Sequence, residues 1–219
     1  MIKREHYLSK VRDFYNSDLV KIITEIRRGG KSIILEQIME EIKEQFDNII
    51  YLNFEDERVI SNISNCELLL DYVDKNRKDG LCYVFFDEIQ EVTDWQKACK
   101  TLRLHNTSVF ITSSNSKILS KEFTKELSGR YVSFRIRPFF YKEILAYSKE
   151  TKNNYSITDY LVWGGFPKIL EFSNKEDREF FLNDIYSSIV NKDLIVGFNI
   201  KNTELFKKLW SWRLNKYYY

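Results

Sequence analysis

The stretch "DLVKIITEIRRGGKSIILEQIMEEIKEQF", residues 18–46, joins two hydrophobic patterns of different period through a pair of glycines. Residues 18–26 are β-branched and apolar, which predicts a buried strand. Residues 31–46 carry apolar side chains at helical spacing. These are Ile34, Leu35, Ile38, Ile42 and Phe46. A strand, a tight loop and a helix in this order predict the first unit of an α/β fold.

The alternation of strands and helices continues to about residue 140. Further strands are predicted at 48–56, 81–88, 107–114 and 131–139. Further helices are predicted at 67–77, 94–104 and 117–129. Because the strands are apolar throughout and separated by helices, we expect a parallel five-stranded sheet with helices on both faces, the three-layer core of P-loop NTPases.

Beyond residue 140 the patterns are helical only. The predicted helices lie within 141–150, 156–166, 175–190 and 202–212. We therefore expect a core at 1–140 and a small helical subdomain at 141–219.

Composition excludes few functions. The charges of the 34 basic and 32 acidic residues nearly cancel, so the net charge gives no indication of a nucleic-acid partner. Binding of nucleic acid through a local basic patch is still compatible with this composition. Cys66, Cys82 and Cys99 lack the spacing of metal ligands and are expected to be reduced. The charged N-terminal segment 1–10 predicts no signal peptide, and no apolar run of 18 residues predicts a membrane span. We expect a cytoplasmic protein.

The loop between the first strand and helix matches most of the phosphate-binding pattern G-x-x-x-x-G-K-[ST]. Backbone N–H groups at the start of a helix bind phosphate oxygens, and a glycine pair permits the close approach. In this interpretation Lys31 reaches the β- and γ-phosphates and Ser32 offers its hydroxyl to Mg²⁺. The expected nucleotide-binding residues are Arg28, Gly29, Gly30, Lys31 and Ser32. The loop alone is also compatible with a plain turn between a strand and a helix.

Two acids complete the prediction. Asp87 and Glu88 follow the apolar run "VFF", so they stand at the carboxyl end of a predicted strand, where parallel sheets bind ligands. Asp87 is placed to hold Mg²⁺, and Glu88 to orient and deprotonate the attacking water. The phosphate loop and the acidic pair, in this order, together predict a nucleotide site.

Glu25 stands where the phosphate-loop pattern has its first glycine. The replacement removes no N–H donor but adds a carboxylate near a polyanion. We expect weaker nucleotide binding unless Arg27 or Arg28 pairs with Glu25, and therefore a working or weakened site.

Several stretches together resemble the prokaryotic AAA+-type ATPases that carry an uncharacterised C-terminal domain, a group near the STAND signal-transduction ATPases. They are "EIRRGGKS", "YVFFDEIQEVTDWQK", "VFITSSNSKILS", "LSGRYVSFRIRPFFYKEIL" and "YLVWGGFPKIL". The resemblance implies a sensor at Ser113–Asn115, with Asn115 catalytic, and an arginine finger at Arg130. It also implies a turn at Gly165–Pro167 whose Pro167 contacts the nucleotide. With Lys31 and Glu88, these would form the catalytic set.

Plainer explanations remain for the three implied elements. Ser113–Asn115 is also a good helix N-cap cluster, Arg130 a good surface arginine at a helix end, and the segment 164–167 a simple turn. The family usually has glycine where Glu25 and Ser113 stand, and its members continue beyond residue 219, so the resemblance implies a missing C-terminal region.

The leading hypothesis is an enzyme that binds ATP and hydrolyses it with Mg²⁺ to drive a conformational switch. A module that binds ATP or ADP without useful turnover is the alternative, and a small-molecule P-loop kinase is a third. A homo-oligomer or a protein partner, bound through the helical region, is compatible with the sequence, and no membrane association is expected.

Overall fold

The computed structural model describes residues 2–25, 29–113, 126–151 and 154–215. By its internal contacts the chain divides into two compact units, Met1–Glu171 and Phe172–Tyr219. The predicted boundary near residue 140 falls inside the first unit, and a separate helical subdomain at 141–219 stays a prediction. Most of the predicted helix at 117–129 lies outside the described residues.

The first unit contains a five-stranded sheet in the order β2-β3-β4-β1-β5. All four pairings are parallel, which confirms the predicted fold class. The strands are β1 (Val20–Glu25), β2 (Ile49–Asn53), β3 (Cys82–Asp87), β4 (Thr107–Ser113) and β5 (Tyr131–Ile136). Because every strand runs in the same direction, their carboxyl ends share one edge of the sheet.

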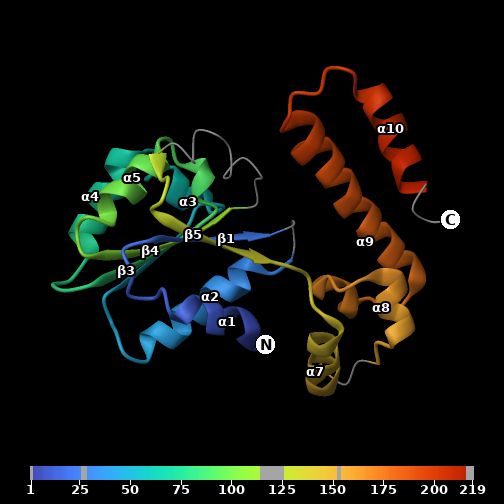
Figure 1. The fold of residues 1–219 in the computed structure, drawn as a ribbon, viewed down its shortest axis with the longest axis horizontal. Coiled ribbons are helices and arrows are strands. Elements are labelled where there is room, and N and C mark those ends of the chain that lie inside the picture. Colours follow the sequence, from blue (N-terminus) through green and yellow to red (C-terminus); the bar gives the residue numbers. More distant parts are fainter. Residues whose placement is uncertain (1, 26–28, 114–125, 152–153, 216–219) are drawn as a thin grey trace. The chain divides into compact units, whose positions relative to one another are not determined.

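Helices cover both faces of the sheet, as Figure 1 shows. On one face lie α1 (Glu5–Arg12) and α2 (Lys31–Lys43), and on the other α3 (Glu57–Ile60), α4 (Cys66–Asn76) and α5 (Trp95–Leu102). Each face has its own apolar core, because successive strand residues point to opposite sides. Phe85, for example, packs toward α1 and α2, while Phe86 packs toward α4 and α5. Both rings are fully buried, so the interior strand β3 has no exposed face.

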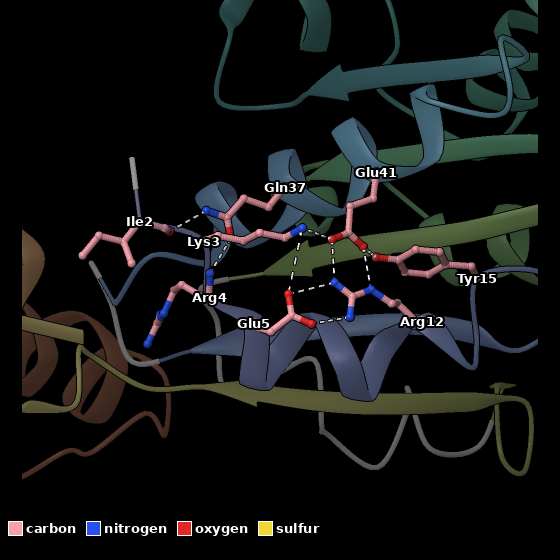
Figure 2. Close-up of polar contacts among 8 residues, drawn as sticks. All are labelled: Ile2, Lys3, Arg4, Glu5, Arg12, Tyr15, Gln37 and Glu41. Carbon is pink, nitrogen blue, oxygen red and sulfur yellow. Dashed lines mark hydrogen bonds and ion pairs between the residues drawn. The ribbon is translucent and has the colours of Figure 1, made fainter. Parts of the chain in front are cut away.

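The helix α1, which the sequence analysis did not predict, is held on α2 by a charged network (Figure 2). Glu41 of α2 accepts hydrogen bonds from Arg12 Nε and Nη2 at 2.9 and 2.7 Å, and from the Tyr15 hydroxyl at 3.0 Å. Lys3 Nζ lies 2.8 Å from the same carboxylate. The hydrogen bonds from Arg12 are the largest of the effects that lower the pKa of Glu41 to about 2.

The remaining elements are helical, in agreement with the pattern beyond residue 140. The first unit ends with α7 (Tyr141–Thr151), α8 (Ile157–Trp163) and the 3₁₀ turn η3 (Pro167–Glu171). The second unit consists of α9 (Lys175–Ser188), the π-helical η4 (Ile189–Val196) and α10 (Thr203–Asn215). None of the helices seen in the described ranges combines the length and apolarity that a membrane span requires.

Candidate nucleotide site at the carboxyl edge of the sheet

The predicted functional residues gather where β1, β3 and β4 end. Glu25 is the last residue of β1, Asp87 the last of β3 and Ser113 the last of β4. All three side chains lie at the same edge because the strands are parallel neighbours. Crevices outside this edge are the usual ligand sites of parallel α/β sheets.

The phosphate loop enters α2 through a left-handed residue. Gly30 has φ of +104° and caps the N-terminus of α2, whose first residue is Lys31. Glycine adopts this conformation at little cost, whereas a residue with a Cβ is strained there. Gly29 is buried and Ser32 half-buried on the first turn of the helix. Arg28, the remaining predicted loop residue, lies outside the described residues.

Lys31 is the centre of the site. Its backbone N–H donates to Glu25 Oε2 at 2.6 Å, and its ammonium lies 3.6 Å from Glu25 Oε1. The ammonium also forms a close ion pair with Glu88. All three side chains are nearly inaccessible to solvent, with exposed fractions of 9% for Lys31 and 3% for each glutamate. The sequence analysis offered Arg27 or Arg28 as the partner of Glu25, and the structure shows that Lys31 is one.

Burial and charge oppose each other in this triad. Burial alone would lower the pKa of Lys31, but the carboxylates of Glu88 and Glu25 raise it, so the ammonium form is held. Burial raises the pKa of Glu25 to about 6, although the charge of Lys31 lowers it. Removing a charge from water is costly unless an opposite charge and hydrogen bonds replace the solvent. Lys31 provides both to Glu25.

Thr112 of β4 is a site residue that sequence reasoning missed. Its hydroxyl donates to Asp87 Oδ1 in a short hydrogen bond, and accepts from the backbone N–H of Glu88 at 3.0 Å. Glu88 has a left-handed φ of 55°, so its N–H points back to β4 as the chain turns out of β3. One buried hydroxyl thus orients both acids. The register that brings Thr112 beside Asp87 follows from the pairing of Ile111 with Phe86.

Arg4 is a second residue outside the predicted site set. It is 1% exposed, yet its guanidinium contacts the phosphate loop, where Nη1 donates to the carbonyl of Gly29 at 3.3 Å. Nη2 donates to the carbonyl of Arg137 at 2.8 Å, and the fork of Nε and Nη2 binds both carboxylate oxygens of Glu143 in α7 at 2.8 and 3.0 Å. Gln37 fixes the backbone of Arg4 with a bond of 3.1 Å (Figure 2). The loop and α7 are therefore tied to one side chain.

Among the residues implied only by the resemblance, Ser113 ends β4 at the site, whereas Arg130 lies away from it. Arg130 is exposed, and its carbonyl accepts from the N–H of Val20, the first residue of β1. Glu25 lies five residues further along the same strand, about 16 Å away at the usual rise per residue. A finger role for Arg130 therefore calls for a second copy of the chain. Asn115 lies outside the described residues.

The turn at 164–167 packs against the connection between β5 and α7. The backbone N–H of Phe139 donates to the carbonyl of Gly165 at 2.7 Å. A Cβ at Gly165 would stand 2.0 Å from the carbonyl oxygen of Phe139, so only glycine fits. Pro167 begins η3 and is half-buried. The structure thus gives Gly165 a packing role, and contact of Pro167 with a nucleotide stays a prediction.

The hydrogen-bond donors and oxygen ligands at this site suit a phosphate group accompanied by a hard cation such as Mg²⁺. The Glu25 carboxylate on the Lys31 N–H shows that the start of α2 accepts an anion. Ser32 and Asp87 offer the oxygen ligands that Mg²⁺ prefers. No group of three or more histidine, cysteine, aspartate or glutamate side chains in the described ranges could hold a metal by itself. A Mg²⁺ ion at this site would therefore take further ligands from phosphate and water, which is its usual habit.

Comparison with known proteins agrees with this geometry. A family model described as "AAA domain" matches residues 17–145, more than half of the chain, from just before β1 into α7. The chain belongs to the AAA domain family. The match includes Lys31, Asp87, Glu88 and Thr112, whereas Arg4 precedes it.

Two curated relatives of this AAA domain protein carry the name "Uncharacterized protein". One, from Haemophilus influenzae, is 34% identical over 220 residues, which cover 95% of this chain and 54% of the relative. The other, MJ1544 of Methanocaldococcus jannaschii, is 36% identical over 205 residues, covering 87% of this chain and 45% of the relative. The chain therefore spans about half the length of the curated relatives it matches.

Solved structures share the fold of the AAA domain. The Walker-type ATPase PABY2304 of Pyrococcus abyssi superposes with a TM-score of 0.58 at 16% identity, over 95% of this chain and 76% of that protein. AMPPCP-bound DnaA from Aquifex aeolicus superposes with a TM-score of 0.51 at 13% identity, over 86% and 64% of the two chains. At these identities the likeness establishes the fold alone, an α/β fold of the P-loop NTPase type.

Proposed function

We propose that this AAA domain binds ATP with Mg²⁺ and hydrolyses it. The observation that carries the proposal is the arrangement around Lys31, whose N–H and ammonium hold carboxylate oxygens at the start of α2, beside Asp87 and Glu88. A loop that binds a buried carboxylate has the donors that a phosphate needs. The DnaA of the same fold is bound to AMPPCP, an ATP analogue, which supports adenine nucleotide as the ligand.

Each residue has a distinct task in the proposed reaction. Lys31 binds the phosphates and offsets their charge, and Ser32 and Asp87 hold the metal. A bound Mg²⁺ supplies charge neutralisation on the phosphate oxygens. Glu88 orients the attacking water and accepts its proton. Thr112 is a positioning residue, because its hydroxyl orients Asp87 and Glu88 without itself touching the nucleotide.

The proposed outcome of turnover is a conformational switch, as in the STAND-like ATPases that the sequence resembles. Arg4 is the contact through which the loop would act, since it binds both Gly29 and Glu143 of α7. A change in the position of the Gly29 carbonyl would alter the hydrogen bonding of a buried guanidinium, whose other acceptors lie in α7 and its connection to β5. The proposed location is the cytoplasm.

The alternative is a module that binds nucleotide without useful turnover. Two observations favour it. Glu25 already holds the donors of Lys31, and Arg130 lies at the far end of β1 from the site. Within a single chain Arg130 would then not offset charge on the transferred phosphoryl group.

The experiment is phosphate release from ATP with and without Mg²⁺. We compare the parent protein with Glu88→Gln, and with Glu91→Gln as a control that changes the same charge at an exposed position nearby. Hydrolysis that requires Mg²⁺, is lost in Glu88→Gln and is kept in Glu91→Gln supports the enzyme. ATP binding without release in any protein supports the binding module, and phosphate transfer to an added acceptor would indicate a kinase.

A further inference from the structure

Glu25 occupies a position that the phosphate-loop pattern reserves for glycine, and the structure shows what its side chain does there. Its carboxylate bends from the end of β1 to the start of α2, where Oε2 accepts the backbone N–H of Lys31 at 2.6 Å. Its other oxygen lies 3.6 Å from the Lys31 ammonium. Gly30, the N-cap of α2, provides no side-chain cap, so the Glu25 carboxylate satisfies an N–H group of the first turn.

These contacts are the ones that a phosphate would make. In a phosphate loop the backbone N–H groups at the helix start and the ammonium of the lysine both bind phosphate oxygens. We propose that the Glu25 carboxylate is a built-in anion that holds these donors, so that ATP binds the loop only by displacing it. Glu25 is thereby an affinity-determining residue of the nucleotide site. This inference rests on the proposed function.

The charges that face Glu25 make the displacement necessary. Lys31, from α2, is the cation that it contacts, while Glu88 and Asp87, at the end of β3, add negative charge around the same ammonium. Burial raises the pKa of Glu25 to about 6, against the lowering effect of Lys31, and the nearby Glu88 adds to the increase. A triphosphate would bring further negative charge to a lysine that two carboxylates already share. Glu25, whose ion pair with the ammonium is the longer of the two, has to move away or gain a proton.

The consequence of this competition is a lower net affinity of the site for nucleotide. Each ATP must replace a charge-assisted hydrogen bond with its own, so the net affinity is the difference between two similar interactions. Glycine at position 25 would leave the donors to the phosphate alone. Glutamate in place of glycine at position 25 therefore lowers the affinity for ATP without removing any donor of the phosphate site.

The test measures the dissociation constant of Mg²⁺-ATP, and of pyrophosphate as a bare-phosphate probe, at pH 8 by calorimetry. Glu25→Gln keeps the size of the side chain and removes its charge, and Glu25→Gly restores the loop pattern. Glu40→Gln, at an exposed position of α2, is the control for the change in net charge. Melting temperatures confirm that each variant is folded.

We expect both Glu25 variants to bind ATP and pyrophosphate on the order of tenfold more tightly than the parent, the size of one charge-assisted hydrogen bond. Glu40→Gln is expected to match the parent. Equal or weaker binding by the two Glu25 variants, with a parent that binds, overturns the inference and makes Glu25 a structural cap of α2. If no protein binds either ligand, including the Glu25 variants, the proposed function itself fails.

Discussion

Thr112→Val tests whether one hydroxyl orients both acids of the site. The substitution replaces the hydroxyl by a methyl group of similar size at a position with no exposed surface. It removes the hydrogen bond to Asp87 and leaves the N–H of Glu88 without its acceptor. An unsatisfied buried group costs about 1–3 kcal/mol, and a lost bond to a charged group about 1.5–3 kcal/mol. Because both losses come from one hydroxyl and do not simply add, we expect a net loss of about 2–4 kcal/mol.

Thr112→Ser is the matched control, because it keeps the hydroxyl and loses only a buried methyl group, worth about 1 kcal/mol. In a chain of this size 1 kcal/mol shifts the melting temperature by about 2–4 °C. We therefore expect Thr112→Val to melt several degrees below Thr112→Ser in a thermal scan. The valine variant should also need more Mg²⁺ for ATP hydrolysis than the serine variant. A valine variant as stable and as active as the serine variant would refute the positioning role of Thr112.

Three further predictions concern charged residues. Lowering the pH from 8 to 6 should tighten ATP binding more in the parent than in Glu25→Gln. The pKa of Glu25 is raised to about 6, so its protonation in this range releases the donors of Lys31. Equal pH dependence of the two dissociation constants in calorimetry would contradict this prediction. Lys21 is fully buried and its pKa is lowered to about 7, chiefly by burial, so between pH 7 and 10 the unfolded chain binds more protons and stability rises with pH. Lys21→Met should flatten that rise in urea unfolding, and an unchanged slope would remove Lys21 from the explanation. Arg4→Lys, which keeps the charge but loses the fork, should lower kcat for ATP more than it raises KM, whereas a change in KM alone would argue against coupling between the loop and α7.

The local pattern of the sequence was sufficient for the central elements. The apolar run of β3 and the helical spacing of α2 depend on neighbours within a few residues, and both elements lie close to their predicted bounds. Strand β5 ends at Ile136, earlier than predicted, and Pro138, which has no N–H to give, follows closely. The helix α1 was missed because its mixed pattern is stabilised by contacts distant in sequence, such as that of Arg12 with Glu41.

Only the residues of the candidate site that belong to a sequence motif could be predicted. Lys31, Asp87 and Glu88 stand at recognisable positions, and the structure brings them together. The role of Thr112 depends on the register between β3 and β4, which no single segment encodes. The contact of Glu25 with Lys31 depends on how close the end of β1 lies to the start of α2. The sequence pattern alone left Arg27 and Arg28 as the candidate partners of Glu25.

The central claim is that Lys31 anchors the phosphates of ATP at the start of α2. Calorimetric titration with Mg²⁺-ATP tests it most directly when the parent is compared with Lys31→Ala and with Lys43→Ala, which removes the same charge from the last turn of α2. We predict that the parent and Lys43→Ala bind alike. Loss of a charge-assisted contact costs about 1.5–3 kcal/mol, so Lys31→Ala should bind at least tenfold more weakly. Equal affinity of Lys31→Ala and the parent would contradict the account.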